Sequence, residues 1–463
     1  MKLKLEHLAV LLIFLFAFIM RIYFLTKYDL LYGVDAGYYF MRVNETLTAG
    51  VPDIGISPPI IFYYLSFFSL VFEDVTIGIK VGAALLSAAM AFPFYFLLLQ
   101  ISKNKKIAIL GSFLGAFSYA NVRIMEGLLK NLGGLFFGVF FIYFLLRVFE
   151  EKKKRDIILT TLSFILMLGT HFSSTAYIVV SLFPFLLLFP AIDYYEKKSL
   201  TTEAKLSFCA AIMILICAIF VLAIRPDLIT GEGIGTLGLQ NLKPGQNWFN
   251  FSILGAYSIM IVFILLGLLN IYKLNKRHFF LFLIWLIMSL LLMQPIFVDH
   301  SWVIRFELMA YLVSVPLMAI GALYLISNKP LFYFSILLIC LFNFYLFYQM
   351  GDALAPIITN EEWDGFLTLH TAFPNASFTG VSGGIKYWAQ AAGLNLTDGK
   401  TANFVILQKD RHSVSIPPNP IFHFGRFFIL NNMKIKQPNP CGDGICDNFE
   451  KNNEFICPQD CPR

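Results

Sequence analysis

Ionisable residues stand beside the ends of apolar segments, in parts of the sequence that the charge pattern assigns to one side of a membrane. Because ionisable groups are costly at membrane depth, residues in such positions are functional candidates by default. Carboxylates supply proton acceptors and cations bind phosphate, so the mixture predicts a site for an anionic lipid headgroup and an acceptor. The candidates are Asp35, Arg42, Arg123, Glu126, Lys130, His171, Glu232, Asp299, His300, Arg305 and Glu307. The alternative is that these loops are polar without being functional.

Asp35 is the strongest single candidate for a catalytic base or a metal ligand. It stands in the stretch Gly33-Val-Asp-Ala-Gly-Tyr-Tyr-Phe-Met-Arg42, whose aromatic residues would partly desolvate the carboxylate. A desolvated carboxylate is a stronger base. The structural alternative is that Asp35 caps a short helix that begins at Ala36.

His171 is a second catalytic candidate. It lies in Gly169-Thr-His-Phe-Ser-Ser-Thr, at the outer end of a short apolar run. An imidazole there would shuttle protons or bind phosphate. More often, a histidine in such a place simply hydrogen-bonds a neighbouring loop.

A membrane is needed to position these candidates. The chain has 463 residues, of which 58% are apolar and only 14% charged, and its mean hydropathy is +0.72. No soluble core could bury so much apolar surface. The net charge of +6 points to no nucleic acid, because the Lys and Arg residues sit in short loops between apolar runs. The sequence therefore predicts an integral membrane protein with lipid as a partner.

Apolar stretches long enough to cross a bilayer recur throughout residues 1–350. They lie near 8–25, 79–101, 107–120, 132–149, 157–170, 172–192, 206–225, 252–272, 279–297, 303–327 and 331–350. Two are short, so we expect an all-α polytopic domain of about ten or eleven transmembrane helices. The first stretch resembles a signal peptide but lacks a small-residue cleavage site, and we interpret it as a retained helix.

The orientation follows from the loops between these stretches. Alternating them across the membrane places the strongly basic loops on the side of the N-terminus, which the positive-inside rule assigns to the cytoplasm. These loops are 103–106, 150–156, 193–205, 273–278 and 327–329. The sequons at Asn44, Asn250, Asn375 and Asn395 all fall on the other side. We therefore expect a multi-pass cell-membrane protein with a cytoplasmic N-terminus and an extracytoplasmic C-terminus.

Two extracytoplasmic segments have structure of their own. In the first, the run 60–72 follows two prolines and is too short to span comfortably, so it predicts an interfacial helix. Past Met350 the hydropathy falls, and helix-like and strand-like pieces alternate with Gly-rich turns, which predicts a small α/β module of about 90 residues. We expect three parts: a membrane domain at 1–350, the module at 351–440 and a Cys-rich tail at 441–463.

The tail is the sharpest local motif. Its cysteines are Cys441, Cys446, Cys457 and Cys461. An extracytoplasmic location favours two disulfides, in any of three connectivities, with zinc as the alternative. The acidic residues between the cysteines could add a calcium site. The remaining cysteines lie in apolar helices, where we expect buried side chains: Cys209, Cys217 and Cys340.

The pattern of these motifs resembles the catalytic subunits of oligosaccharyltransferase and, more broadly, the GT-C superfamily of membrane glycosyltransferases, which use polyprenyl-phosphate-linked sugars. An Asp after the first helix, with Tyr and Arg nearby, carries the first match. Asn121-Val-Arg-Ile-Met-Glu-Gly127 carries the second, and His300-Ser-Trp-Val-Ile-Arg305-Phe306 carries the third. The resemblance covers most of residues 10–325 and implies a GT-C-like fold.

The resemblance assigns roles to individual residues. Asp35 matches the acidic residue that binds metal at the acceptor, so Mg²⁺ or Mn²⁺ is a candidate cofactor there, although the sequence requires no cofactor. Arg305 matches the arginine near the lipid phosphate, and Arg123 matches a loop arginine of the same cavity. We add Lys130 and His300 to these donor-phosphate residues.

Three departures from the family pattern matter. Where the family has an acidic pair, this chain has Leu129-Lys130-Asn131, and a lysine cannot bind a divalent cation. Gln240-Asn241 stands where a glutamate is expected, which leaves Glu232 as the nearest catalytic carboxylate. No Trp-Trp-Asp-Tyr-Gly element is present, and Ser382-Gly-Gly-Ile-Lys-Tyr-Trp388 is at most a remnant of it. A metal-independent relative, in which cations neutralise the leaving phosphate, is easier to reconcile with this pattern.

We interpret the chain as a GT-C-like glycosyltransferase. It would move a sugar from a polyprenyl- or dolichyl-linked phosphate or pyrophosphate donor to a protein or glycan acceptor on the extracytoplasmic face. One alternative is a transporter or flippase of lipid-linked sugars, which would need charged residues at mid-helix depth. The other is a non-catalytic homologue that binds donor or partner.

Overall fold

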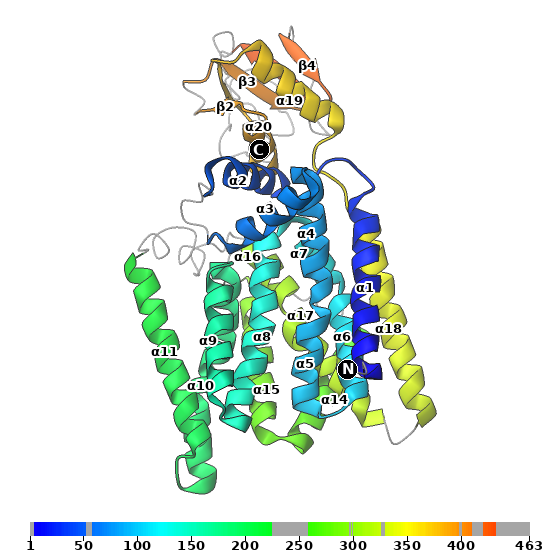
Figure 1. The fold of residues 1–463 in the computed structure, drawn as a ribbon, viewed down its shortest axis with the longest axis vertical. Coiled ribbons are helices and arrows are strands. Elements are labelled where there is room, and N and C mark those ends of the chain that lie inside the picture. The colour runs from blue at the N-terminus through cyan, green and yellow to red at the C-terminus, as the bar shows by residue number, and fades with distance from the viewer. Residues whose placement is uncertain are drawn as a thin grey trace, which may run out of the picture. The chain divides into compact units, whose positions relative to one another are not determined.

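The structure is a computed structural model of the whole chain. It describes residues 4–51, 58–224, 258–295, 298, 300–325, 329–397, 401–409 and 420–431 (Figure 1). Four predicted features lie outside these residues: Glu232, Asp299, the sequon at Asn250 and the four-cysteine tail.

The chain divides into two compact units. Unit 1 comprises Met1–Tyr28 and Arg42–Ala355, and unit 2 comprises Asp29–Met41 and Pro356–Arg463. Each unit is described by itself below.

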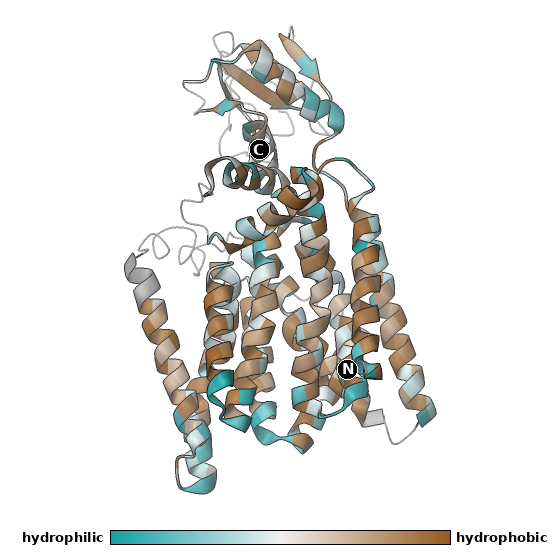
Figure 2. Cartoon of the chain, viewed as in Figure 1, coloured by the Kyte–Doolittle hydropathy of each residue, from teal (hydrophilic) through white to brown (hydrophobic). Residues whose placement is uncertain are grey.

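Unit 1 is a bundle of apolar helices. Among the described residues, seven helical segments are long and apolar enough to cross a membrane. They are α1 (Leu5–Leu25), α4 with α5 (Val75–Ala89 and Ala91–Ser102), α6 with α7 (Lys105–Ala116 and Tyr119–Gly127), α8 (Leu129–Glu151), α10 (Phe172–Lys197), α16 with α17 (His300–Met309 and Tyr311–Gly321) and α18 (Lys329–Asp352). Figure 2 shows hydrophobic residues along most of their length. The protein is therefore a multi-pass membrane protein, as predicted.

Other helices of the unit complete the bundle. They are α3 (Ile60–Phe72), α9 (Lys154–Leu168), α11 (Thr202–Ile224), α14 (Ser258–Leu274), α15 (Lys276–Leu292) and the short 3₁₀ helix η2 (Ala322–Leu325). Every predicted apolar stretch overlaps one of the helical segments of unit 1, and α3 coincides with the short run predicted at 60–72.

The prediction of buried cysteines in these helices is wrong for Cys209, which is exposed on α11. Its neighbours Phe208 and Ile212 are exposed as well. An apolar residue in a membrane helix can face lipid instead of protein, because lipid tails are as apolar as the bundle interior. Hydropathy alone therefore does not separate the two faces of α11.

A buried arginine lies at the break between α6 and α7 and hydrogen-bonds the end of α6. Arg21, on α1, is fully buried and donates to the carbonyl of Ala116, the last residue of α6, and to Ser87 Oγ at 2.6 Å. Asn121 Nδ2 adds hydrogen bonds to the carbonyls of Ser87 and Gly115, at 3.0 and 3.1 Å. A helix break inside a membrane frees carbonyls that water cannot reach, so side chains must satisfy them. This network satisfies the carbonyls that the break frees at the end of α6.

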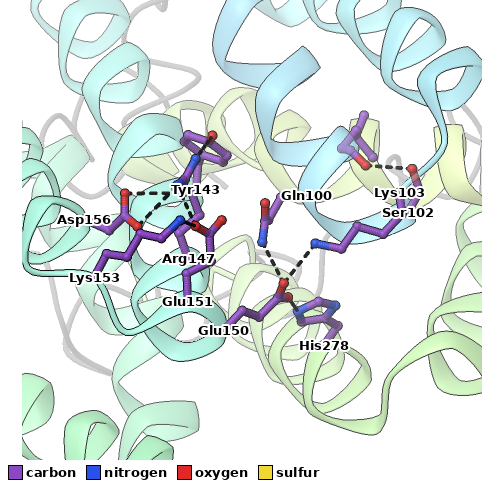
Figure 3. Close-up of polar contacts among 11 residues, drawn as sticks. Gln100, Ser102, Lys103, Tyr143, Arg147, Glu150, Glu151, Lys153, Asp156 and His278 are labelled. Atoms are coloured by element: carbon purple, nitrogen blue, oxygen red, sulfur yellow. Dashed lines mark hydrogen bonds and ion pairs between the residues drawn. The ribbon is translucent and has the colours of Figure 1, made fainter.

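Polar residues gather at one end of the bundle (Figure 3). Glu150, near the end of α8, accepts hydrogen bonds from Gln100 Nε2 at 2.6 Å and from Lys103 Nζ at 2.9 Å. His278 Nε2, on α15, lies 3.1 Å from the same carboxylate. At the start of α1, Glu6 pairs with Lys105 at 2.6 Å.

Those contacts join the loops at 103–106, 150–156 and 273–278 to the start of α1. The prediction that these basic loops lie on the side of the N-terminus is therefore confirmed. Their assignment to the cytoplasm stays a prediction.

Unit 2 contains a small mixed sheet with the strand order β2-β1-β3-β5-β4. The strands are β1 (Ser377–Thr379), β2 (Asn395–Leu396), β3 (Phe404–Gln408), β4 (Phe422–Phe424) and β5 (Phe427–Asn431). β1 pairs in parallel with β2 and β3, whereas β5 is antiparallel to β3 and β4. Two helices accompany the sheet, α19 (Asn360–Ala372) and α20 (Gly383–Ala391). The predicted small α/β module is thus present.

The segment Asp29–Met41 packs as part of unit 2, which the sequence did not indicate. Here α2 (Ala36–Ala49) begins, and the ring of Phe40 lies 6.0 Å from that of Trp388 on α20. A Cβ on Gly37 would lie 2.6 Å from the backbone nitrogen of Trp388, so only glycine permits this approach. The stretch that contains Asp35 therefore packs against the small α/β module.

Candidate functional site

The predicted cationic and polar residues of unit 1 stand on helices that pack against one another at the end of α8 opposite the Glu150 cluster. Lys130 stands in the first turn of α8, and Glu150 stands in its last. Lys130 and Glu150 are 20 residues apart on this helix, which separates them by roughly 30 Å, about the thickness of a bilayer core. The site at the Lys130 end is built from α7, α8, α10 and α16.

His171 is held firmly at the start of α10. It is the N-cap residue of that helix, and its Nδ1 accepts a hydrogen bond from the backbone N–H of Ser174 at 3.3 Å. Ser174 Oγ donates to the carbonyl of Asn131 on α8 at 3.3 Å. A Cβ on Gly134 would lie 2.7 Å from Ser174 Cβ, so a glycine is required where the helices approach. The imidazole is therefore fixed against the first turns of α8.

The surroundings of His171 keep its imidazole neutral. Burial, together with the positive charges of Lys130 and Arg305, holds the pKa of His171 well below its ordinary value. Nδ1 accepts a hydrogen bond from the backbone N–H of Ser174, which favours the tautomer that carries its proton on Nε2. In that tautomer His171 donates a hydrogen bond through Nε2. The alternative of a hydrogen bond to a neighbouring loop is not what the structure shows, because Nδ1 of His171 caps its own helix, α10.

Arg305 is positioned by aromatic packing. Its guanidinium lies over the ring of Trp302, 4.9 Å from the centroid. The next residue, Phe306, stacks on Tyr177 of α10 at 5.8 Å between ring centroids. The Tyr177 hydroxyl is in turn 2.8 Å from Ser289 Oγ on α15. Helix α16 is therefore anchored on α10 and α15, and it presents Arg305 to the surroundings of His171.

Arg123 has a carboxylate partner on its own helix. On α7 it forms an ion pair with Glu126, one turn along the helix. That spacing of three residues is visible in the sequence, so the pair could have been predicted. The positive charge of Arg123 is consequently matched before any ligand arrives.

Asn131 is a member of the site that sequence reasoning missed. Its side chain is only 2% exposed, and its Nδ2 has no hydrogen-bond partner among the described residues. A buried donor without a partner is costly and calls for an explanation such as a ligand or water. Its place directly after Lys130 was the available signal.

Asp35 immediately precedes α2, and its carbonyl accepts a hydrogen bond from the Tyr39 N–H at 3.0 Å. The helix predicted to begin at Ala36 is therefore present. Asp35 belongs to unit 2, whereas the cations belong to unit 1, so their convergence stays a prediction. His300 opens α16, but its side chain lies outside the described part of the structure, as does Glu232.

The solved structures that share the fold of this chain include two membrane proteins. One is an oligosaccharyltransferase of Archaeoglobus fulgidus in complex with zinc and sulfate, with a TM-score of 0.62 and 14% identity over 86% of this chain and 68% of that one. The other is ArnT of Cupriavidus metallidurans bound to undecaprenyl phosphate, with a TM-score of 0.55 and 9% identity over 91% of this chain and 98% of that one. The expected GT-C-like fold is thereby confirmed. No protein-family model and no curated protein matches the sequence.

Proposed function

We propose that this protein is a membrane glycosyltransferase that takes a sugar from a polyprenyl-phosphate-linked donor. The observation that carries the proposal is the GT-C-like fold, in which α8 with Lys130 and α16 with Arg305 both pack against α10, whose N-cap is His171. A donor of this kind keeps its polyprenyl chain in the bilayer and brings its phosphate to the level of the helix ends. Two cations beside a hydrogen-bond donor suit that phosphate.

Sugar transfer needs positive charge beside the phosphate that leaves. It also needs a base beside the hydroxyl or amide that receives the sugar. Lys130 and Arg305 stabilise the negative charge that develops on the leaving phosphate. Asp35 accepts the proton of the acceptor hydroxyl or amide, or orients that group, with Glu232 as the second carboxylate of the site. A protein or glycan on the extracytoplasmic face is the proposed acceptor.

A flippase of lipid-linked sugars is disfavoured by the surroundings of the one charged residue found deep within α1. Arg21 is fully buried and makes hydrogen bonds to Ser87 and to the carbonyls of Ala17 and Ala116. It therefore serves the bundle and does not line a path for a headgroup.

Reconstituted protein tests the proposal. Proteoliposomes would receive a polyprenyl-phosphate-linked sugar labelled in the sugar, together with an envelope extract as a mixture of acceptors. We expect the label to move into water-soluble protein or glycan. Movement of intact labelled lipid between leaflets without transfer would support the flippase, and donor binding without either activity would support a non-catalytic homologue.

A further inference from the structure

The sequence contains four Asn-x-Ser/Thr sequons, and the structure describes three of them. These three begin at Asn44, Asn375 and Asn395. A sequon accepts an N-linked glycan where it lies on the surface of a protein outside the cell. The predicted orientation places all three outside, so the local structure of each sequon determines whether a sugar can be attached to it.

Asn44 stands within helix α2, and a helix does not suit a sequon. The asparagine acts together with the hydroxyl residue two positions later, but residues i and i+2 of a helix do not face each other. Thr46 is only 6% exposed, and its hydroxyl donates to the Arg42 carbonyl at 2.7 Å. The helix therefore turns the hydroxyl away from Asn44 and into the protein.

Asn395 lies in β2, at one edge of the sheet of unit 2. Its side chain is exposed, and residues i and i+2 of a strand share a face. However, Oγ1 of Thr397 is buried, and the Thr397 N–H donates to the Phe378 carbonyl at 2.9 Å. The hydroxyl of this sequon is therefore out of reach of an enzyme.

Asn375 lies in a turn between α19 and β1. The Ala376 N–H donates to the Phe373 carbonyl at 3.1 Å, which places Pro374 and Asn375 at the two central positions of a β-turn. Both of these residues are exposed, and the Asn375 side chain forms no hydrogen bond with any residue that the structure describes. The turn therefore presents the Asn375 amide to solvent.

The hydroxyl of the same sequon lies at the surface as well. Ser377 Oγ donates to Asn403 Oδ1 at 2.9 Å and to the Thr401 carbonyl at 3.2 Å. Thr401 and Asn403 are both exposed, so water can replace these hydrogen bonds at little net cost. The contacts also form only after the chain beyond Asn375 has folded back onto β1. The Ser377 hydroxyl is therefore within reach of an enzyme.

We propose that Asn375 is an N-glycosylation site and that Asn44 and Asn395 stay unmodified. The amide nitrogen of Asn375 forms a bond to the anomeric carbon of a sugar on a lipid-linked phosphate donor, and the bond from that carbon to the phosphate oxygen breaks. The phosphate leaves with the bonding electrons, and the amide proton passes to a base of the transferase. This inference does not rest on the proposed function, because here the chain accepts a sugar from a membrane oligosaccharyltransferase of the cell.

Peptide mass spectrometry of the full-length chain tests the proposal. The protein is purified from membranes of a host that attaches glycans to an Asn-Ala-Ser sequon in a secreted reporter, which is the positive control. We expect the peptide that contains Asn375 to carry the mass of a glycan, and the peptides that contain Asn44 and Asn395 to have their unmodified masses. An unmodified Asn375 beside a modified reporter would overturn the proposal, and so would a glycan on Asn44 or Asn395.

Variants of the sequon separate attachment at Asn375 from other causes of added mass. Ser377→Ala removes the hydroxyl but keeps Asn375, so we expect it to lose the glycan as fully as Asn375→Gln does and to migrate faster on a gel. Ser377→Thr keeps a hydroxyl and should migrate as the wild type does. Asn44→Gln is the matched control and should leave the mobility unchanged, and the melting temperature of each variant checks its fold. A glycan that persists in Ser377→Ala would contradict the assignment to this sequon.

Discussion

Asp35 is expected to affect the rate of sugar transfer, whereas the cations of unit 1 are expected to affect the binding of the donor. Asp35→Asn keeps the size of the side chain but removes the proton acceptor, so we expect sugar transfer to fall roughly 100-fold or more. Donor binding should change little, because the proposed partner of Asp35 is the acceptor. Asp29→Asn is the matched control, since Asp29 lies in the same segment and accepts a hydrogen bond from Asn360 at 3.0 Å. Transfer at the wild-type rate in Asp35→Asn would end its role as base.

His171 should make the stability of the protein depend on pH. In the unfolded chain its pKa is about 6.5, whereas burial and the nearby cations lower the pKa in the folded protein. Below about pH 6.5 the unfolded state therefore binds more protons, so stability is full above that pH and falls as the pH drops towards the folded pKa.

We expect His171→Asn, which keeps the helix cap and cannot protonate, to reduce this loss between pH 7.5 and pH 5.5, two values chosen to bracket the ordinary histidine pKa. The melting temperature in detergent measures it. His423→Asn, at an exposed position, should leave the pH dependence unchanged. An identical acid response of His171→Asn and wild type would contradict the assignment.

The break between α6 and α7 determines the positions of Arg123 and Glu126 on α7. Arg21→Leu would leave the Ala116 carbonyl and Ser87 without their donor inside the bundle. An unsatisfied buried group costs about 1–3 kcal/mol, so we expect a loss of stability of that order. Hydrogen exchange of the first turns of α7 should rise as well. Arg155→Leu, at an exposed position in the Glu150 end of the bundle, is the control. Unchanged stability and exchange in Arg21→Leu would show that water or a neighbour replaces the arginine.

Some features of the fold could be predicted from the sequence, and others could not. Long apolar runs predict membrane helices because hydrophobicity acts locally, and even the basic loops found around Glu150 follow from a simple alternation across the bilayer. The packing of Gly37 against Trp388 joins residues that are far apart in the chain, so no local pattern contains it. The burial of Asn131 has the same origin, since it depends on how closely α10 approaches α8. The departure from the family pattern at Leu129-Lys130-Asn131 pointed to this place, but only the packing shows that Asn131 Nδ2 has no hydrogen-bond partner among the described residues.

Orientation of the whole molecule is the last property that the basic loops predict. They share an end of the bundle with Glu6, so the positive-inside rule places that end in the cytoplasm. The C-terminus would then lie outside, where Cys441, Cys446, Cys457 and Cys461 would form two disulfides.

Two measurements check this orientation. A reporter fused after Arg463 should signal from outside the cell, and mass spectrometry without reduction should find no free thiol among the four cysteines. Cysteines that alkylate fully without reduction would favour zinc over disulfides. A reporter signal from the cytoplasm would show that the orientation is the reverse of the predicted one. The Lys130 end, with its proposed phosphate site, would then lie at the cytoplasmic face.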